Sequence, residues 1–410
     1  MNLASTAYIL ICAALVLLMT PALALFYGGL GRRKNVLNTM MMSLAPMAIA
    51  SILWVALGFT LSFSGHGAFL GNLAHPFMEG VSMVKATIFP GNHIPDGVFS
   101  IFQMMFSIIA VALLTGSVVG RIRFLPMLFF MIFWLLLVYY PLAHSIWGGG
   151  FLQKLGVLDF AGGIVIHISS GVTGLVLALF IGRRRDYKRI DYRPHNIPFV
   201  VLGTGLLWFG WFGFNSGSAL GLNAQAGQAF LNTNTAAACA MLVWMLIEYV
   251  RFGKMSAIGA CTGAIVGLAT ITPAAGFVPL WAAMIIGALA SPVSFFMMTV
   301  VKSKFNYDDS LDVFGCHGVG GMLGSLLVGV FAVPSLAHAK GLILGSAKLL
   351  GLQFLAVVFA IVFSAVVSWV LIKIISLFTE IRVSERAESL GLDDSEHEET
   401  AYPTFLGLDS

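Results

Sequence analysis

Long apolar stretches alternate with short polar segments along almost the whole chain. A membrane-spanning helix needs about 20 mainly apolar residues, and eleven stretches approach or exceed that length, the eighth being short and the eleventh long. They cover residues 6–28, 38–63, 98–120, 124–147, 160–182, 196–214, 227–250, 256–272, 276–300, 315–333 and 347–376. The pattern predicts an all-α polytopic membrane protein with eleven transmembrane helices.

The basic residues indicate how these helices are oriented. The first apolar stretch has no basic segment before it, and the cluster Arg32, Arg33 and Lys34 follows it, so it is predicted to be a membrane span and not a signal peptide. With the N-terminus outside, 18 of the 22 Lys and Arg residues lie on the cytoplasmic side and four lie outside. This bias satisfies the positive-inside rule and predicts a cytoplasmic C-terminus in a multi-pass protein of the cell (cytoplasmic, inner) membrane.

Composition supports a lipid environment. Apolar residues make up 59% of the chain and charged residues 10%, whereas soluble domains contain about 25% charged residues. The net charge of +4 comes from the cytoplasmic loops, and so it does not indicate nucleic-acid binding. All four cysteines lie in apolar stretches, without the spacing of a zinc site or the loop positions of a disulfide framework.

Eleven spans divide naturally into five, five and one. A duplicated five-span unit must insert its second copy upside down, which gives an inverted repeat with a site near the midplane. Span 5 opens with Asp159 and carries His167, and span 10 follows Asp312 and carries His317. The spacings differ, eight residues against five, so the sequence only suggests the repeat.

The last segment of the chain has a different character. From about residue 378 it becomes polar and acidic (DDSEHEE) and loses its apolar periodicity. We therefore expect a transmembrane domain over residues 1–377 and a cytoplasmic tail over 378–410, too short to be an independent domain.

Ionisable residues inside membrane spans are rare and are therefore candidates for a functional role. His167 and His317 lie within spans 5 and 10, each with glycines nearby that allow close helix approach. Two alternatives stand for them: the imidazoles share an N–H···N bond, or each bonds separately to a backbone carbonyl. A metal site with Cys316 is not predicted, because adjacent helical residues point to different faces. No Lys, Arg or Glu lies in the middle of a span, which argues against a charge-relay pump or an anion carrier.

Aromatic residues gather near the predicted outer ends of spans 3, 4 and 6, beside glycine-rich sequence. Single rings at such places are ordinary interfacial anchors, but a cluster attracts a small cation, with about 2 kcal/mol or more once the cation is desolvated. Ser218 adds an acceptor oxygen. The rings are Phe102, Phe106, Trp147, Trp211, Phe212 and Phe214.

Several segments resemble the ammonium transporter family (Amt/Mep/Rh), in order and over nearly the whole chain. Trp147 favours the Amt branch over the Rh branch. The segments are ALFYGGLGRRKN at 24–35, IWGGG at 146–150, DFAGG at 159–163 followed by His167, GWFGFNSGSA at 210–219, GACTGAIVGL at 259–268 and DVFGCHGVGG at 312–321.

The resemblance implies a homotrimer in which each subunit has its own narrow pore for ammonium or methylammonium, without a cofactor or a metal. It implies ammonium recruitment by Trp147, Ser218 and Phe102, with Asp159 organising the vestibule; from the residues alone, Asp159 is the N-cap of helix 5. A phenyl gate then falls on Phe106 and Phe214, the pore imidazoles are His167 and His317, and Trp211 packs beside them.

The resemblance also implies that a PII-type signalling protein regulates the chain through the cytoplasmic tail. The family often has Glu before Arg121, where this chain has Gly120, so the resemblance does not predict how the tail docks.

An ammonium ion cannot enter a dry pore at an acceptable cost unless it is neutralised. The expected route is capture of the cation, loss of a proton near the phenyl gate, and passage of ammonia past the histidines, with net proton transfer left open. K⁺ has no proton to lose and is excluded. The alternatives are an ammonium sensor that signals through a cytoplasmic partner, and a channel for a neutral gas or solute. No nucleophile–base set suggests an enzyme.

Overall fold

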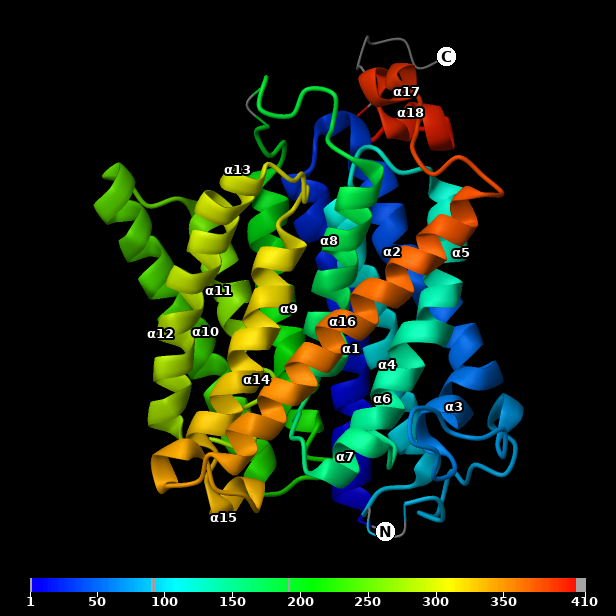
Figure 1. The fold of residues 1–410 in the computed structure, drawn as a ribbon, viewed down its shortest axis with the longest axis vertical. Helices are drawn as coiled ribbons and strands as arrows, with labels where there is room; N and C mark the ends of the chain where they lie inside the picture. The colour runs from blue at the N-terminus through cyan, green and yellow to red at the C-terminus, as the bar shows by residue number, and fades with distance from the viewer. Residues whose placement is uncertain (1, 90, 92, 191, 403–410) are drawn as a thin grey trace.

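The computed structural model describes residues 2–89, 91, 93–190 and 192–402; the end of the predicted tail, 403–410, lies outside them. The described part of the chain is a bundle of tilted helices, and the N-terminal and C-terminal parts of the chain lie at opposite ends of this bundle (Figure 1). It contains no β-strand, only an isolated antiparallel bridge between Ile122 and Arg382. An all-helical bundle satisfies its backbone polar groups internally, as lipid requires.

Ten helical stretches of the described chain are long and apolar enough to cross a membrane. They are Leu3–Leu30 (α1), Arg33–Phe63 (with α2, Val36–Leu53, and α3, Phe59–Phe63), Asp96–Val118 (with α4, Asp96–Leu113), Phe124–Leu155 (with α5, Phe124–Trp134, α6, Tyr140–Trp147, and α7, Phe151–Leu155), Gly163–Ile181 (with α8, Ser169–Ile181), Ile197–Gly217 (α9), Ala224–Phe252 (α10), Leu280–Phe305 (with α12, Leu280–Phe296, and α13, Lys302–Phe305), Phe314–Phe331 (with α14, Val319–Phe331) and Lys348–Ser376 (α16).

The eighth predicted span corresponds to α11, Ala257–Ile271, which has 15 residues. At 1.5 Å per residue it is about 22 Å long, less than the hydrocarbon thickness of about 30 Å. The termini at opposite ends of the bundle agree with an odd number of crossings. The count of eleven and the orientation stay predictions.

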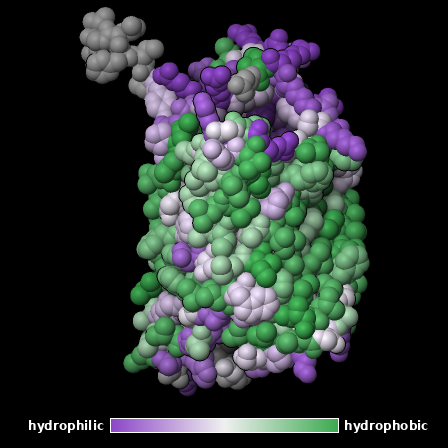
Figure 2. Space-filling model, turned by 90° about the vertical axis from the view of Figure 1, so that its left-hand side faces the viewer, coloured by the Kyte–Doolittle hydropathy of each residue, from purple (hydrophilic) through white to green (hydrophobic). Residues whose placement is uncertain are grey.

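The surface has the zones expected of a membrane protein. Figure 2 shows a broad hydrophobic band between two more hydrophilic ends, with hydrophilic residues densest at the end that carries α17 (Glu385–Leu390) and α18 (Leu392–His397). Large apolar side chains on α10, α12 and α16 are exposed on this band, for example Leu242, Met284 and Phe354. Lipid or another protein surface would cover them in a membrane.

Small residues allow the first helices of the two predicted repeats, α1 and α9, to pack closely. A Cβ added at Gly203 would lie 2.6 Å from Phe26 N, and one at Gly213 would lie 2.7 Å from Leu15 Cβ. Such contacts are the usual way in which glycine brings membrane helices together. Any larger side chain at these positions would push α9 away from α1.

Several spans contain a π-helical turn. Two of these turns carry the predicted pore histidines: η6, Gly163–Ile168, holds His167, and η8, Phe314–Gly318, holds His317. The packing around them is reciprocal, because α14 packs on η6 and α8 packs on η8. This exchange supports the predicted five-plus-five repeat at the level of the two histidine-bearing helices.

The tail, residues 378–402, docks on the same end of the bundle as the basic loops. Arg123 N donates to Ile381 O (2.9 Å), and Val383 N donates to Arg121 O (3.1 Å). Further along, the carboxylate of Asp393 accepts from Asn38 N at 2.9 Å. The acidic run of the tail is therefore bound to the ends of membrane helices, which its composition did not predict.

Candidate functional site

A rim of aromatic side chains lies toward the N-terminal end of the bundle. The rings of Phe106 and Trp147 meet edge to face with centroids 6.2 Å apart, and those of Phe102 and Phe106 lie 4.8 Å apart. Phe102 also packs against Gly217, where an added Cβ would lie 2.7 Å from its ring. Ser218 follows directly, so three of the four predicted recruitment residues share one rim.

The hydroxyl of Ser218 donates to Phe214 O at 2.9 Å. This bond occupies the hydrogen and leaves the oxygen lone pairs free to accept. Trp147 is only half-buried, and its indole N–H donates to the backbone oxygen of Asp159 at 2.8 Å. The rim thus offers a fixed indole face and one hydroxyl acceptor.

Two phenyl rings of the predicted gate lie between this rim and the histidines. Phe106 and Phe214 stack with centroids 4.3 Å apart and planes 9° apart. Both side chains are almost completely buried. A solute that moves past them must separate the rings or tilt them, because the stack leaves no space for a molecule between them.

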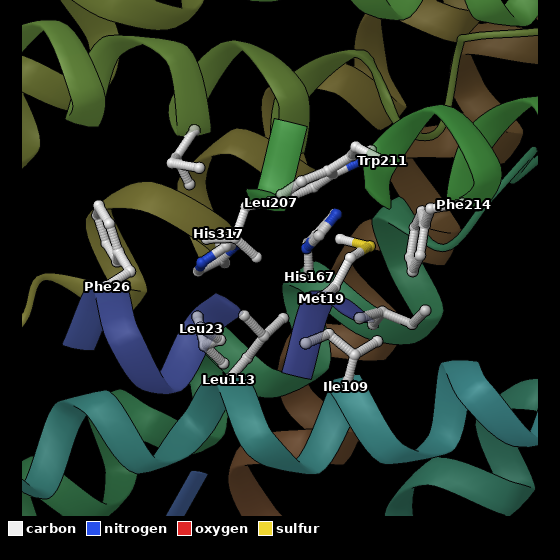
Figure 3. A pocket seen from close by; sticks show the side chains of 12 residues that line it. Met19, Leu23, Phe26, Ile109, Leu113, His167, Leu207, Trp211, Phe214 and His317 are labelled. Carbon is white, nitrogen blue, oxygen red and sulfur yellow. The ribbon is translucent and has the colours of Figure 1, made fainter. Parts of the chain in front are cut away.

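The two histidines lie beyond the phenyl pair. Figure 3 shows His167 between Phe214 and His317, with Trp211 beside it. The imidazole centroids of His167 and His317 are 5.2 Å apart, and those of His167 and Trp211 are 5.5 Å apart. Trp211 Nε1 donates to Thr272 Oγ1 at 2.9 Å, which holds the indole in place.

The hydrogen bonds expected for the histidine pair are not formed. Both ring nitrogens of His167 and Nδ1 of His317 are buried without a hydrogen-bond partner. The two rings are close, but no N–H of one reaches a nitrogen of the other with hydrogen-bond geometry. Neither the shared N–H···N bond nor bonds from these three nitrogens to backbone carbonyls are present, so the nitrogens remain available to a small polar solute.

Glycines let the two histidine-bearing helices approach. A Cβ at Gly318 would lie 3.4 Å from Gly171 Cα, and one at Gly321 would lie 3.0 Å from His167 Cβ. The predicted close approach of the helices is therefore present. Larger side chains at these glycines would separate the imidazoles.

The space around the histidines is small and apolar. A cavity of about 10 Å³ lies there, close to the minimum that holds one water molecule. Apolar side chains dominate its wall, and the two imidazoles are its main polar groups. The lining consists of Met19, Leu23, Phe26, Ile109, Leu113, Ile166, His167, Leu207, Trp211, Phe214, Ile265 and His317 (Figure 3).

On the tail side, His317 also borders a much larger hollow of about 400 Å³. Its wall includes two acidic residues, Glu248 and Asp312, together with Cys316 and Tyr192. Among the described residues, no three His, Cys, Asp or Glu side chains are arranged to hold a metal ion. The hollow thus connects the histidine pair with the polar end of the molecule.

Asp159 does not reach the rim with its side chain. Its carboxylate accepts from four backbone N–H groups, those of Gly162, Gly163, Ile164 and Val165, at 2.7 to 3.1 Å. These are the donors that the first turn of a helix leaves unpaired. Asp159 therefore caps the His167 helix from upstream, whereas the N-cap position itself is Gly162 and not Asp159 as predicted. Its backbone oxygen fixes Trp147.

The equivalent aspartate in the second half is Asp309 and not Asp312. Asp309 Oδ2 accepts from Phe314 N, five residues ahead, just as Asp159 Oδ2 accepts from Ile164 N. Each aspartate stands eight residues before its histidine. The predicted match of Asp312 with Asp159 is therefore wrong, and Asp312 instead forms an ion pair with Lys302 at 2.7 Å.

Sequence reasoning missed two groups that build the site. Thr272, which orients Trp211, lies in an apolar stretch with no motif to single it out. Asp309 carried a usable signal, because its spacing to His317 equals that from Asp159 to His167.

Comparisons with known proteins identify the family of the chain. The sequence model of the Ammonium Transporter Family matches residues 7–402. The chain is 47% identical to an ammonium transporter of Bacillus subtilis over 407 residues, which is 98% of this chain and 99% of that protein.

Solved structures of the same family are also similar to this chain. The crystal structure of Mep2 from Saccharomyces cerevisiae is similar with a TM-score of 0.87 and 36% identity, covering 94% of this chain and 88% of that one. A sensor Amt protein is similar with a TM-score of 0.88 and 28% identity, covering 96% and 98% of the two chains.

Proposed function

The chain belongs to the Ammonium Transporter Family, and from this premise we propose that it captures ammonium at the aromatic rim and conducts it past the histidine pair as ammonia. The observation that carries the proposal is the order of the groups. A cation-attracting rim is separated by stacked phenyl rings from a nearly dry cavity that contains two imidazoles with unpartnered nitrogens. We take the rim as the outer side and the tail as the cytoplasmic side of a cell membrane.

Capture takes place at Trp147, Phe102 and Ser218. The half-buried indole attracts the cation with about 1 kcal/mol while the ion is still partly hydrated, and with more as water is lost. The Ser218 oxygen accepts one N–H of the ion. Asp159 is a positioning residue, because its carboxylate is filled by four backbone donors and its backbone oxygen holds the Trp147 indole.

Proton loss follows at the phenyl pair. Moving an unpaired ion into an apolar cavity costs far more than the rim can offset, whereas the neutral amine passes at a small cost. Ammonia can then hydrogen-bond to the free nitrogens of His167 and His317 as donor or acceptor. K⁺ has no such neutral form, so the dry cavity excludes it without a dedicated filter.

The proposal also covers the oligomeric state of the protein and its regulation. The exposed apolar side chains along the band offer surface for subunit contacts as well as for lipid, and the homotrimer in which each subunit keeps its own pore follows from the family. The tail contacts the ends of two membrane spans, through Asp393 at Asn38 N and through Glu396 at Phe124 N. This docking supports a regulatory role for residues 378–410, with a PII-type signalling protein as the partner at this face.

The test measures electrical current and substrate uptake in the same preparation. Purified protein in proteoliposomes receives an ammonium pulse, and the current is recorded together with uptake of isotope-labelled methylammonium. Ammonium-driven transport that K⁺ does not elicit is expected for the wild type. A neutral-solute channel would give swelling without ammonium selectivity, and a pure sensor would give neither current nor uptake; either result would refute the proposal.

Variants localise the effect to the histidine pair. His167→Ala and His317→Ala remove a ring from the wall of the small cavity, let water enter, and should reduce ammonium transport or admit K⁺. The matched control is His144→Gln, because His144 is also buried but hydrogen-bonds Ser62 O and Gly67 O outside the cavity. If both alanine variants transport and exclude K⁺ like the wild type, the pore lies elsewhere.

A further inference from the structure

A second hollow, of about 840 Å³, opens on the tail side between the loop after α8 and the tail. We call it the arginine hollow, because arginines make up most of its lining. The lining consists of Arg183, Arg184, Arg185, Tyr187, Arg189, Arg382, Val383 and Glu385. Five arginines and one glutamate give these side chains a formal charge of +5 − 1 = +4.

Two of the five arginines have carboxylate partners. Arg184 Nη2 lies 2.6 Å from Asp308 Oδ1, and Arg382 Nη2 lies 2.8 Å from Glu388 Oε2. Burial alone would raise the pKa of Asp308, but the hydrogen bond and charge of Arg184 and the charge of Arg121 hold that pKa below its usual value. These pairs are satisfied and build the wall of the hollow.

The other three arginines have no carboxylate partner in the described chain. The guanidinium of Arg185 donates to Ser389 Oγ at 2.8 Å, a neutral acceptor. The exposed guanidinium groups of Arg183 and Arg189 have no hydrogen bond or ion pair with any described residue. Three positive charges without an ion pair thus face one hollow, and Glu385 is the single acidic side chain in its described lining.

The backbone that carries these three arginines is fixed. Arg183 O accepts from Arg382 Nη2 at 2.7 Å, and Arg185 N donates to Glu388 Oε1 at 2.7 Å. Arg189 N donates to Asp186 O at 2.9 Å. Because the loop is already held, a ligand would need to order only the side-chain ends, which lowers the entropic cost of binding.

The positive-inside rule explains why basic residues lie on this side of the membrane, but not why three of them surround one hollow in which Glu385 is the single acidic side chain of the described lining. Some basic residues elsewhere on the same side do have carboxylate partners: Arg123 lies 3.5 Å from Glu380, and Lys302 lies 2.7 Å from Asp312. Like charges that share a site repel each other. An anion in the arginine hollow would relieve that repulsion.

We propose that the arginine hollow binds a phosphate group, carried either by an anionic lipid headgroup or by a soluble phosphate compound. Guanidinium groups bind phosphate oxygens in a bidentate manner and remain charged at all physiological pH values. Glu385 acts against the anion, whereas the carbonyl end of α8 is already covered because Arg382 Nη1 donates to Ile181 O. The bound phosphate joins the loop after α8 to the tail, which supplies Arg382 and Glu385. This inference does not depend on ammonium transport.

The test uses the full-length protein in phosphatidylcholine nanodiscs, with two probes. Inorganic pyrophosphate, titrated calorimetrically, represents the soluble source, and phosphatidic acid, added to the nanodiscs and counted by native mass spectrometry, represents the lipid source. A basic residue near a membrane surface contributes about 1 kcal/mol to the binding of anionic headgroups, or roughly fivefold in affinity. The triple variant Arg183→Gln, Arg185→Gln, Arg189→Gln should therefore bind roughly a hundredfold more weakly.

The control removes the same charge from the same side but away from the hollow: Arg251→Gln, Lys254→Gln, Lys304→Gln. Glu385→Gln should tighten binding roughly fivefold, a gain that misfolding cannot produce. A selective loss in the triple variant for pyrophosphate supports a soluble ligand, and one for phosphatidic acid alone supports a lipid. Equal loss in the control, no binding of either probe, or no gain in Glu385→Gln would overturn the proposal.

Discussion

Asp159→Asn is the most informative single substitution in the site, because the hydrogen bonds that the Asp159 carboxylate accepts can be counted. Its two oxygens each accept from two backbone N–H groups, so four donors depend on it. An asparagine keeps one oxygen and places an N–H₂ group at the other position. Two of the four backbone donors then face another donor in a buried site.

The cost follows from that count. A buried donor without an acceptor costs about 1–3 kcal/mol, so two such donors cost about 2–6 kcal/mol. A typical total stability is about 5–15 kcal/mol, and the loss is therefore a large part of it. The internal control is Asp309→Asn, because Asp309 caps only Phe314 N and its Oδ1 has no partner. There the amide oxygen can keep the one bond, and we expect a loss of about 1 kcal/mol or less.

The assay is thermal unfolding of both purified variants, followed by methylammonium uptake. Asp159→Asn should lower the unfolding midpoint several times more than Asp309→Asn. It should also raise the concentration for half-maximal uptake, because the backbone oxygen that holds the Trp147 indole moves with the cap. Equal destabilisation of the two variants, or a larger effect at Asp309, would refute the assignment of Asp159 as the main cap of its helix.

Two further predictions concern the rim and the tail. Trp147→Leu should raise the methylammonium concentration for half-maximal uptake roughly fivefold, with little change in maximal rate. This is the equivalent of about 1 kcal/mol of cation–π attraction. The control is Trp369→Leu, a substitution on the exposed face of α16, and an unchanged concentration dependence in Trp147→Leu would make Trp147 only an interfacial anchor. Deletion after residue 384 should leave a membrane-inserted trimer by fractionation and gel filtration, because Asp393 and Glu396 each accept only from the N–H of a helix end, at about 1 kcal/mol each. Loss of insertion would show that the tail is structural.

Much of the fold could be predicted because lipid makes each span a continuous apolar run. The predicted span 347–376 and the helix Lys348–Ser376 differ by one residue at one end. The cap at Asp159 was also predictable, because an aspartate before a buried helix has few other ways to pair its charge. These features are encoded within one short segment each.

Features that depend on two distant segments were not predictable in the same way. The hydrogen-bonding of the histidine pair depends on the rotation of η6 against η8, and a π-helical turn in each segment changes that rotation. The tail carboxylates looked solvated because their partners are far away in sequence; Asp393 and Asn38 are 355 residues apart. Composition describes the tail, but only the docked structure gives these carboxylates their donors.

The two halves of the molecule are alike at the histidines and different beyond them. Asp159 and Asp309 each stand eight residues before a histidine on a π-helical turn, which is the symmetric part. On the rim side, the stacked rings of Phe106 and Phe214 isolate a cavity of about 10 Å³, whereas on the tail side His317 borders a hollow of about 400 Å³.

Because of this asymmetry, the two ends of the duplicated helical unit differ in how a hydrated cation can approach the histidines. A hydrated cation can approach His317 from the tail side, because the larger hollow is wide enough for water and is lined by the carboxylates of Asp312 and Glu248. It cannot approach His167 from the rim, because the phenyl stack excludes its hydration shell. The desolvation barrier is therefore concentrated on the rim side, and selection between ammonium and K⁺ is expected to be decided there, before either histidine is reached.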